Sequence, residues 1–319
     1  MELKLIRFIV LLLEWITVHF ISIHLRPRKF SKRVLKSDYE SYGKYKSEWC
    51  ILLQGPIISK HSFTLQTLVL YRYVYPNARI ILSTWREELK KLDQNKLVEL
   101  KVDLLLNTKP EYVGVSNINL QLVSTSAGLN FASDYGVKYV LKTRTDQRVC
   151  KSLDFFGHMH NLQINFPISN DKMENRLIIA STNSFKSRLY GVTDMYMFGN
   201  ISDMKLFWQI PPEEKSEMLP QVNTDPVYFI SNRQAEGYLV NHFFESIGFS
   251  PSWASEDSHY FLAQFFCVVD KEQLDLFWLK YERFIESFAF FRQNDAKNWE
   301  RFEFADWLKA YILYRKIEK

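Results

Sequence analysis

Short apolar runs alternate with helical periodicity four times in the first half of the chain. Each run has the length of a strand, and each segment between two runs has the apolar spacing of a helix. The strands are expected at residues 49–57, 78–85, 102–108 and 138–145, and the helices between them at 62–75, 86–100 and 117–133. This alternation is typical of a mostly parallel sheet flanked by helices, so it predicts an α/β, Rossmann-like fold.

The second half of the chain follows a different pattern. Two strands are expected at 176–182 and 194–199, a helix starting at 203, another helix at 234–247, and two or three aromatic-rich helices between 267 and 318. No Gly/Pro linker follows residue 48. Residues 49–319 are therefore interpreted as one domain of catalytic size, with a helical C-terminal portion at about 255–319.

The N-terminal segment differs from this domain in composition. Residues 1–25 are apolar over roughly the 20 residues that a bilayer requires, and residues 26–36 add six Lys or Arg without an acidic residue. We expect a hydrophobic membrane-anchor helix at 1–25 and a basic juxtamembrane linker at 26–48, which lies against anionic lipid on the cytoplasmic side. Arg7 and Glu14 interrupt the apolar run, so the helix either spans the membrane with these two paired or lies in the membrane plane. A soluble helix packed on the domain is the alternative.

The net charge of +5 comes from this N-terminal segment. Residues 1–36 hold eight Lys or Arg and two Glu, which leaves 33 basic and 34 acidic residues in the rest of the chain. A near-neutral domain argues against a duplex-binding face, so no nucleic-acid partner is expected. Cys50, Cys150 and Cys267 are odd in number and lie beside apolar residues, which indicates buried thiols in a reducing compartment and hence a cytoplasmic catalytic domain.

Polar residues follow each of the four expected parallel strands. The strand ends carry Gln54-Gly55-Pro56, Ser83-Thr84-Trp85, Asn107-Thr108 and Arg144-Thr145-Asp146. Open α/β sheets bind ligands at the carboxyl ends of their strands. These amide, hydroxyl, aromatic and charged side chains are therefore expected to line one crevice.

The fourth strand end indicates the nature of the ligand. A nucleotide-binding α/β sheet with a carboxylate at this place suggests a nucleotide-sugar transferase, in which an Asp-x-Asp triplet holds a divalent cation on the donor diphosphate. Here only the second acid, Asp146, is present, and Arg144 stands in place of the first. Two arrangements stay open: a divalent cation, Mn²⁺ or Mg²⁺, on Asp146, or a direct clamp of Arg144 on phosphate oxygens.

Five segments of the sequence resemble one known family. They are ILLQGPI, FTLQTLVLYRYVYPNARIILSTW, YVLKTRTDQRV, SFKSRLYGVTDMYMFGNISDMKLFW and AEGYL, and in this order they are similar to the WavE lipopolysaccharide-synthesis family over about residues 49–270. The resemblance implies a glycosyltransferase with a GT-A-like fold. It places Gln54, Gly55 and Pro56 under the base and ribose, Ser83, Thr84 and Trp85 beside the base, and Asn117 or Gln121 at the ribose or diphosphate. The alternatives are a plain turn at Gly55-Pro56, a core position for Trp85 and a helix cap at Asn117.

Two carboxylates are candidates for the base that takes the proton of the acceptor hydroxyl. Asp194 lies at a strand start within the densest polar and aromatic patch, SRLYGVTDMY, and Glu236 lies in the first turn of a helix. The sequence ranks them equally. Arg188 and Tyr190, in the same patch as Asp194, are candidates to hold sugar hydroxyls or phosphate on the acceptor side.

The leading interpretation is a glycosyltransferase that moves a sugar from a nucleotide-sugar donor to a lipopolysaccharide or other surface glycan acceptor at the cytoplasmic face of the membrane. A sugar nucleotidylyltransferase is one alternative, although its Gly-rich loop after the first strand is missing, since LLQGPI contains a single Gly. A non-catalytic, membrane-tethered protein that binds nucleotide or glycan is the other alternative, because one Asp could remain after decay of a two-acid site.

Deletion of residues 1–36 is expected to release a folded, soluble protein that still binds nucleotide, because the basic cluster at 26–36 is interpreted as a membrane contact and not as part of the core. Far-UV circular dichroism and a thermal melt check the fold. Aggregation with loss of the thermal transition would show that the segment belongs to the core instead.

Overall fold

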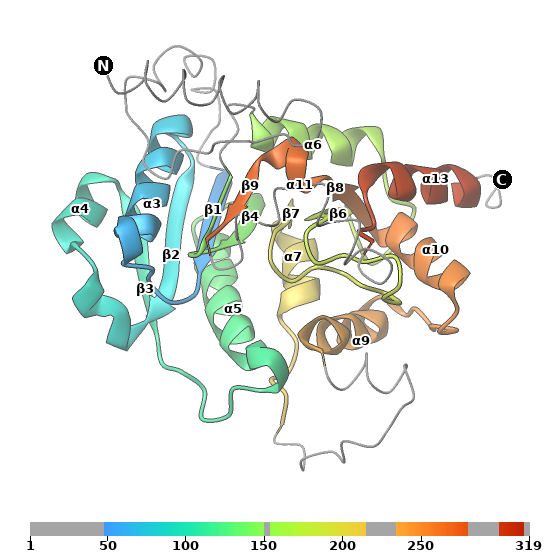
Figure 1. The fold of residues 1–319 in the computed structure, drawn as a ribbon, viewed down its shortest axis with the longest axis horizontal. Helices are drawn as coiled ribbons and strands as arrows, with labels where there is room; N and C mark the ends of the chain where they lie inside the picture. Colours follow the sequence, from blue (N-terminus) through green and yellow to red (C-terminus); the bar gives the residue numbers. More distant parts are fainter. Residues whose placement is uncertain (1–47, 150–153, 215–233, 280–299, 316–319) are drawn as a thin grey trace, which may run out of the picture.

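The computed structural model describes residues 48–149, 154–214, 234–279 and 300–315, and a seven-stranded sheet forms the centre of this part of the chain (Figure 1). In spatial order the strands are β3 (Val102–Asn107), β2 (Arg79–Trp85), β1 (Trp49–Gln54), β4 (Tyr139–Arg144), β7 (Met197–Asn200), β6 (Leu177–Ala180) and β8 (Phe266–Val269). A second, two-stranded sheet pairs β5 (Gln147–Val149) with β9 (Leu276–Trp278).

The direction of the strands confirms the expected α/β fold with a mostly parallel sheet. β1 pairs in parallel with β2 and with β4, and β2 pairs in parallel with β3. β7 is antiparallel to both of its neighbours, β4 and β6, whereas β8 is parallel to β6. In the large sheet, β7 is therefore reversed relative to the other strands.

Helices cover both faces of the sheet (Figure 1). On one face, Phe156 of α6 (Phe155–Asn165) contacts Trp49 of β1 edge to face, at 5.1 Å between ring centroids. On the other face, α5 (Ile118–Asp134) packs on β1 and on α7 (Ile201–Trp208). The remaining helices are η2 (Lys60–Ser62), α3 (Phe63–Val74), η3 (Arg86–Lys91), α4 (Gln94–Glu99), η4 (Val115–Asn117), α9 (Ala235–Ile247), α10 (Ser255–Phe265), α11 (Lys271–Leu274) and α13 (Phe304–Arg315).

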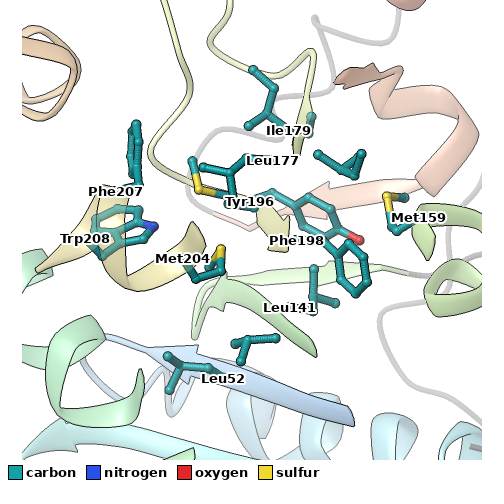
Figure 2. Packing of buried hydrophobic residues seen from close by; sticks show 14 of the residues in the cluster. Leu52, Leu141, Met159, Leu177, Ile179, Tyr196, Phe198, Met204, Phe207 and Trp208 are labelled. Carbon is teal, nitrogen blue, oxygen red and sulfur yellow. The ribbon is translucent and has the colours of Figure 1, made fainter. Parts of the chain in front are cut away.

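The core joins the two halves of the sheet through large apolar side chains. Figure 2 shows side chains of β1, β4, β6 and β7 in one cluster with Met204, Phe207 and Trp208 of α7. Successive residues of a strand face opposite sides, and strands buried on both faces are apolar along their whole length. All residues of β1 and β8 are buried, and both strands are apolar except for Gln54 at the end of β1.

The C-terminal region corrects one expectation from the sequence. Residues 267–318 were expected to form only helices, but Phe266–Val269 is strand β8, which completes the large sheet, and Leu276–Trp278 is strand β9. A short, fully buried strand has no alternation of polar and apolar residues, so its sequence cannot be distinguished from a buried helix by periodicity. The helical C-terminal portion at about 255–319 is thus interrupted by strands.

The segment after β2 is also different from the expected single helix at 86–100. It forms η3 and α4, which are separated at Leu92 and Asp93, where the backbone is extended. Asp93 accepts a hydrogen bond from the backbone N–H of Lys96 and thereby caps α4. Ser62, which precedes α3, makes no side-chain cap hydrogen bond.

The expected membrane-anchor helix at 1–25 and the basic linker up to residue 47 lie outside the described residues. Among the helices of the described part, none combines the length and the hydrophobicity that a membrane span requires. Cys50 and Cys267 are buried free thiols, whereas Cys150 lies outside the described residues.

Gly128 sets how closely α5 approaches the sheet. A Cβ at this position would lie 2.7 Å from Leu52 Cδ2 of β1, far inside van der Waals contact. Gly128→Ala is therefore expected to lower the free energy of unfolding by about 1–3 kcal/mol, despite the higher helix propensity of Ala. Urea denaturation measures the change.

A double-mutant cycle with Leu52→Ala tests the cause, because the truncated side chain leaves room for the new methyl group. In that background, Gly128→Ala should destabilise much less. An equal loss in both backgrounds would show that contact with Leu52 is not the reason.

Candidate functional site

The carboxyl ends of the parallel strands meet at one edge of the sheet. Gln54, the last residue of β1, lies in register with Ser83 of β2 and with Arg144 of β4. Trp85, the last residue of β2, lies in register with Asn107 of β3. The structure therefore brings the polar strand ends together.

Several of these side chains are held by hydrogen bonds within the protein. Ser83 Oγ donates to the carbonyl of Ser124 on α5 at 2.7 Å, and Ser124 Oγ donates to Gln54 Oε1 at 2.9 Å. Asn107 Nδ2 donates to Ser83 Oγ at 2.9 Å. Gln54, Ser83, Thr84 and Trp85 are all buried, and the hydroxyl of Thr84 has no hydrogen-bond partner. The side chains of Gln54 and Ser83 thus fix the strand ends to α5. A ligand at this edge would contact the backbone of the strand ends and not these two side chains.

The loop after β1 requires glycine at its first position. Gly55 has a φ of 119°, and a Cβ there would lie 3.1 Å from Thr145 Oγ1 in the turn after β4. That hydroxyl donates to the carbonyl of Pro56 at 2.6 Å. The loop at 55–56 and the turn at 145–146 are therefore locked together at the carboxyl edge.

The charges after β4 have different roles. Arg148 is buried beneath α3, where it donates to Thr67 Oγ1 and to the carbonyl of Phe63, both at 2.9 Å. Its guanidinium lies 4.2 Å from the Phe63 ring. Arg148 therefore anchors α3. Arg144 remains at the strand end, where it is partly exposed.

Arg144 and Asp146 form a bidentate ion pair. Arg144 Nε donates to Asp146 Oδ1 at 2.9 Å, and its terminal nitrogen donates to Oδ2 at 3.1 Å. The indole N–H of Trp278 on β9 also donates to Oδ2, at 3.0 Å. Burial alone would raise the pKa of Asp146, but the hydrogen bonds and charge of Arg144, together with Trp278, bring it below its ordinary value.

These partners leave Asp146 poorly suited to hold a divalent cation. Both carboxylate oxygens already accept hydrogen bonds from Arg144 or Trp278. In the described part of the chain, no three His, Cys, Asp or Glu side chains are grouped to bind a metal ion. A hard cation here would take most of its oxygen ligands from water and phosphate, and Asp146 would have to give up part of its pairing with Arg144 or Trp278 to bind it.

The reversed strand β7 brings Asp194 to the same edge. Because β7 is antiparallel to β4, the residues that precede β7 lie beside the carboxyl end of β4. Gln121 Nε2 of α5 donates to Asp194 Oδ2. Asp194 is 4% exposed, and its Oδ1 has no hydrogen-bond partner in the structure. A buried carboxylate oxygen without a donor is suited to accept a hydrogen bond from a ligand.

Glu236 lies close enough to Asp194 for their charges to interact. Burial raises the pKa of Glu236, and the charge of Asp194 raises it further, against the opposing charge of Arg188. Arg188 lies 3.5 Å from Glu236 Oε1, and Asn183 Nδ2 donates to the same oxygen. Two carboxyl groups in one site therefore have different environments, which is how one site provides both a base and a proton donor.

Further polar atoms without partners lie after β6, at the same edge. They are the hydroxyl oxygens of Thr182 and Ser184 and the Nε of Arg188, all of them buried. Buried polar groups are almost always hydrogen-bonded, so a concentration of unpaired ones indicates a ligand or ordered water. These atoms lie on the segment that follows β6 and are candidates to contact a ligand.

Two expected site residues lie apart from this group. The ring of Tyr190 is buried among Phe244, Trp253 and Phe261, and its hydroxyl donates to Asp257 at 2.5 Å. Tyr190 is therefore part of the core in this structure. Asn117 precedes α5 at the carboxyl edge, where it is exposed, has a φ of 65° and makes no side-chain cap bond.

Trp278 and Asn183 are among the site residues that were missed in the sequence. Trp278 comes from β9, in a region that the sequence assigned to helices, so no pattern connected it with Asp146. Asn183 follows β6 with a φ of 64°, which Asn tolerates better than most residues, but its contact with Glu236 spans 53 positions.

A cavity of about 190 Å³ lies at a different place, near the start of β6, and is lined by residues that include Arg176, Tyr311 and Arg315. Arg176 donates to the carbonyls of Ala263 and Phe166. None of the polar strand ends lines this cavity. The candidate site is therefore assigned to the carboxyl edge of the sheet because of the polar and charged side chains there.

Comparison with known proteins identifies the family to which the sequence is similar. A family model described as WavE lipopolysaccharide synthesis matches residues 50–246. Among solved structures, the chain is similar to a cytidylyltransferase from Leptospira borgpetersenii serovar Hardjo-bovis (strain JB197), with 12% identity over 78% of this chain and 95% of that chain and a TM-score of 0.36. That likeness is too weak to support an inference about function. No curated protein matches the chain.

The Arg144–Asp146 pair makes a prediction about metal dependence. If Arg144 and not a cation faces a diphosphate, the affinity for a nucleoside diphosphate should differ by less than about twofold between Mn²⁺ and EDTA. Arg144→Lys should weaken it by about tenfold, the equivalent of one charge-assisted hydrogen bond. Calorimetry measures both.

Arg79→Lys is the matched control, because Arg79 begins β2 at the opposite edge of the sheet and should not affect nucleotide affinity. A strong dependence on Mn²⁺ that disappears in Asp146→Asn would assign the counter-charge to a metal ion on Asp146 instead.

Proposed function

The chain belongs to the WavE lipopolysaccharide-synthesis family, and we propose that it is a glycosyltransferase. It would move a sugar from a nucleotide-sugar donor to a lipopolysaccharide or other surface glycan acceptor. The observation that carries this proposal is a pair of carboxyl groups, the buried Asp194 and the partly buried Glu236, at the carboxyl edge that also presents Arg144. The mostly parallel sheet with one reversed strand fits the GT-A-like fold that the family resemblance implies.

The donor diphosphate is proposed to lie at the end of β4. Arg144 presents a planar guanidinium that can hold phosphate oxygens bidentately, and Asp146 with Trp278 fixes its direction. The nucleoside would then lie along the loop at 55–56 and the ends of β2 and β3. Catalysis on such a donor consists mainly of positioning and of stabilising the charge of the leaving diphosphate.

The environments of the two carboxyl groups support different roles for them. Burial and the charge of Asp194 raise the pKa of Glu236, which favours its protonated form and hence a role as hydrogen-bond donor to a sugar oxygen. Asp194 has one oxygen held by Gln121 and one without a partner, so it is suited to accept the proton of the acceptor hydroxyl. Arg188, beside Glu236, would hold acceptor hydroxyls or phosphate.

The location of the reaction is part of the same proposal. A nucleotide-sugar donor is cytosolic and a lipopolysaccharide acceptor is membrane-bound, so an enzyme that joins them gains from being held at the cytoplasmic face. Residues 1–36, apolar and then basic, have the composition for that contact.

A thermal-shift screen of nucleotides and nucleotide sugars, with and without Mn²⁺, tests donor binding. A ligand at about 100 times its dissociation constant should add roughly 2.7 kcal/mol of apparent stability. Positive ligands are then tested for hydrolysis of the nucleotide sugar without acceptor. Binding without hydrolysis or transfer would favour a non-catalytic module, and release of diphosphate from a nucleoside triphosphate and sugar phosphate would favour a nucleotidylyltransferase.

Substitution of the two carboxyl groups should separate their roles. Asp194→Asn removes the base and should lower kcat by about 10²–10⁴, with donor affinity within a few-fold. Glu236→Gln keeps a neutral donor and should keep kcat within about fivefold. Because burial disfavours the ionised form of Glu236, Glu236→Gln should also raise the unfolding free energy at pH values above the ordinary range of a Glu carboxyl.

Steady-state kinetics and urea denaturation measure these effects. An inactive Glu236→Gln beside an active Asp194→Asn would exchange the two roles. Near-native turnover in both variants would show that neither carboxyl group is the base.

A further inference from the structure

Lys142 is a fully buried lysine within a strand of the large sheet. It lies on β4, where all its side-chain surface is removed from solvent. Burying an ammonium group is unfavourable unless it is paired, and a buried ion pair that is replaced as a whole by apolar residues often leaves stability unchanged or raised. A buried charge is therefore weak evidence for a role in stability, and the contacts of Lys142 have to explain it.

Those contacts converge on Asp194. Lys142 Nζ donates to the backbone carbonyl of Asp194 and, at 3.4 Å, to Gln121 Oε1. Gln121 Nε2 in turn donates to Asp194 Oδ2. The ammonium also lies 4.1 Å from the centre of the Trp208 ring, in a cation–π contact.

The ammonium also fixes the orientation of the Gln121 side chain. A lysine ammonium can only donate hydrogen bonds, so the Gln121 oxygen faces Lys142 and the amide nitrogen faces Asp194. Asp194 is thus held at two points, its carbonyl and its Oδ2, while Oδ1 stays without a partner. With the amide reversed, the Gln121 oxygen would face a carboxylate oxygen and repel it.

We propose that Lys142 is a positioning residue that fixes the Asp194 carboxylate, through the backbone of Asp194 and the amide of Gln121, for proton acceptance from the acceptor hydroxyl. This inference rests on the proposed function, in which Asp194 is the base. Lys142 does not touch the substrate. It holds the loop before β7 so that the free oxygen of Asp194 is presented to the site.

The electrostatics agree with this geometry. Burial lowers the pKa of Lys142 to about 7, while the charge of Asp194 opposes that shift; Arg144 lowers the pKa further, and Asp146 raises it. Asp194 is the largest of the influences that keep the ammonium charged. The charge of Lys142 and the charge of Asp194 therefore support one another.

Lys142→Met tests the proposal, because Met fills similar space without a charge or a donor. We expect kcat to fall at least tenfold with the KM for the donor within twofold, since donor contacts are unchanged. The variant leaves the buried Asp194 without this partner, so the global unfolding free energy should fall as well. The local effect is therefore measured against β1: amide hydrogen exchange of residues 192–197 should rise at least tenfold more than exchange in β1. Leu141→Met, on the opposite face of the same strand, is the matched control and should change none of these.

Unchanged exchange and unchanged kcat in Lys142→Met would overturn the proposal. A second measurement does not depend on the folding of that variant: the ¹³Cε resonance of Lys142 is titrated in the full chain and in Asp194→Asn. The pKa of Lys142 should be lower in Asp194→Asn because a supporting negative charge is lost, and an unchanged titration would contradict the coupling.

The exchange and titration readouts do not require a transferase activity. If the wild-type protein transfers no sugar, the proposed function is wrong. The exchange and titration measurements would still show whether Lys142 holds Asp194 in place.

Discussion

The antiparallel pairing of β7 with β4 is the constraint on which the site depends. Six strands of the large sheet run in one direction and end at one edge, and β7 begins at that edge because it is reversed. The reversal places Asp194, which precedes β7, beside Arg144 at the end of β4. With a parallel strand at that position, the chain before it would lie at the opposite edge, and the two charges could not share a site.

Charges buried at this edge are compensated in two different ways. Arg144 and Asp146 form a bidentate pair that Trp278 completes, so their charges balance each other at the strand end. Asp194 and Glu236 are two carboxyl groups in different environments: the charge of Asp194 interacts with that of Lys142, and Glu236 lies beside Arg188. The first group is suited to hold a charged donor in place, and the second is suited to proton transfer. The proposed roles thus follow from the pairing of the charges: the paired Arg144 and Asp146 position the donor, and the carboxyl groups of Asp194 and Glu236 take part in proton transfer.

Much of the sheet could be predicted from the sequence, because β1 to β4 alternate with amphipathic helices and end in polar residues. β8 and β9 could not, because a short buried strand has no periodicity of its own. The carboxyl edge was predictable as a place, and Gln54, Ser83 and Arg144 do lie in register there. What the side chains do was not predictable: Tyr190 packs in the core, Arg148 anchors α3, and the contacts of Lys142 and Trp278 join segments far apart in the chain.

The central claim is that the carboxyl edge of the sheet receives the diphosphate of a nucleotide-sugar donor. A crystal structure of the full chain soaked with the nucleoside diphosphate that stabilises it best tests this claim directly. The account predicts phosphate oxygens within hydrogen-bond distance of the Arg144 guanidinium and the nucleoside along the loop at 55–56. A diphosphate bound instead in the cavity beside Arg176 and Arg315, with the carboxyl edge unchanged, would contradict it.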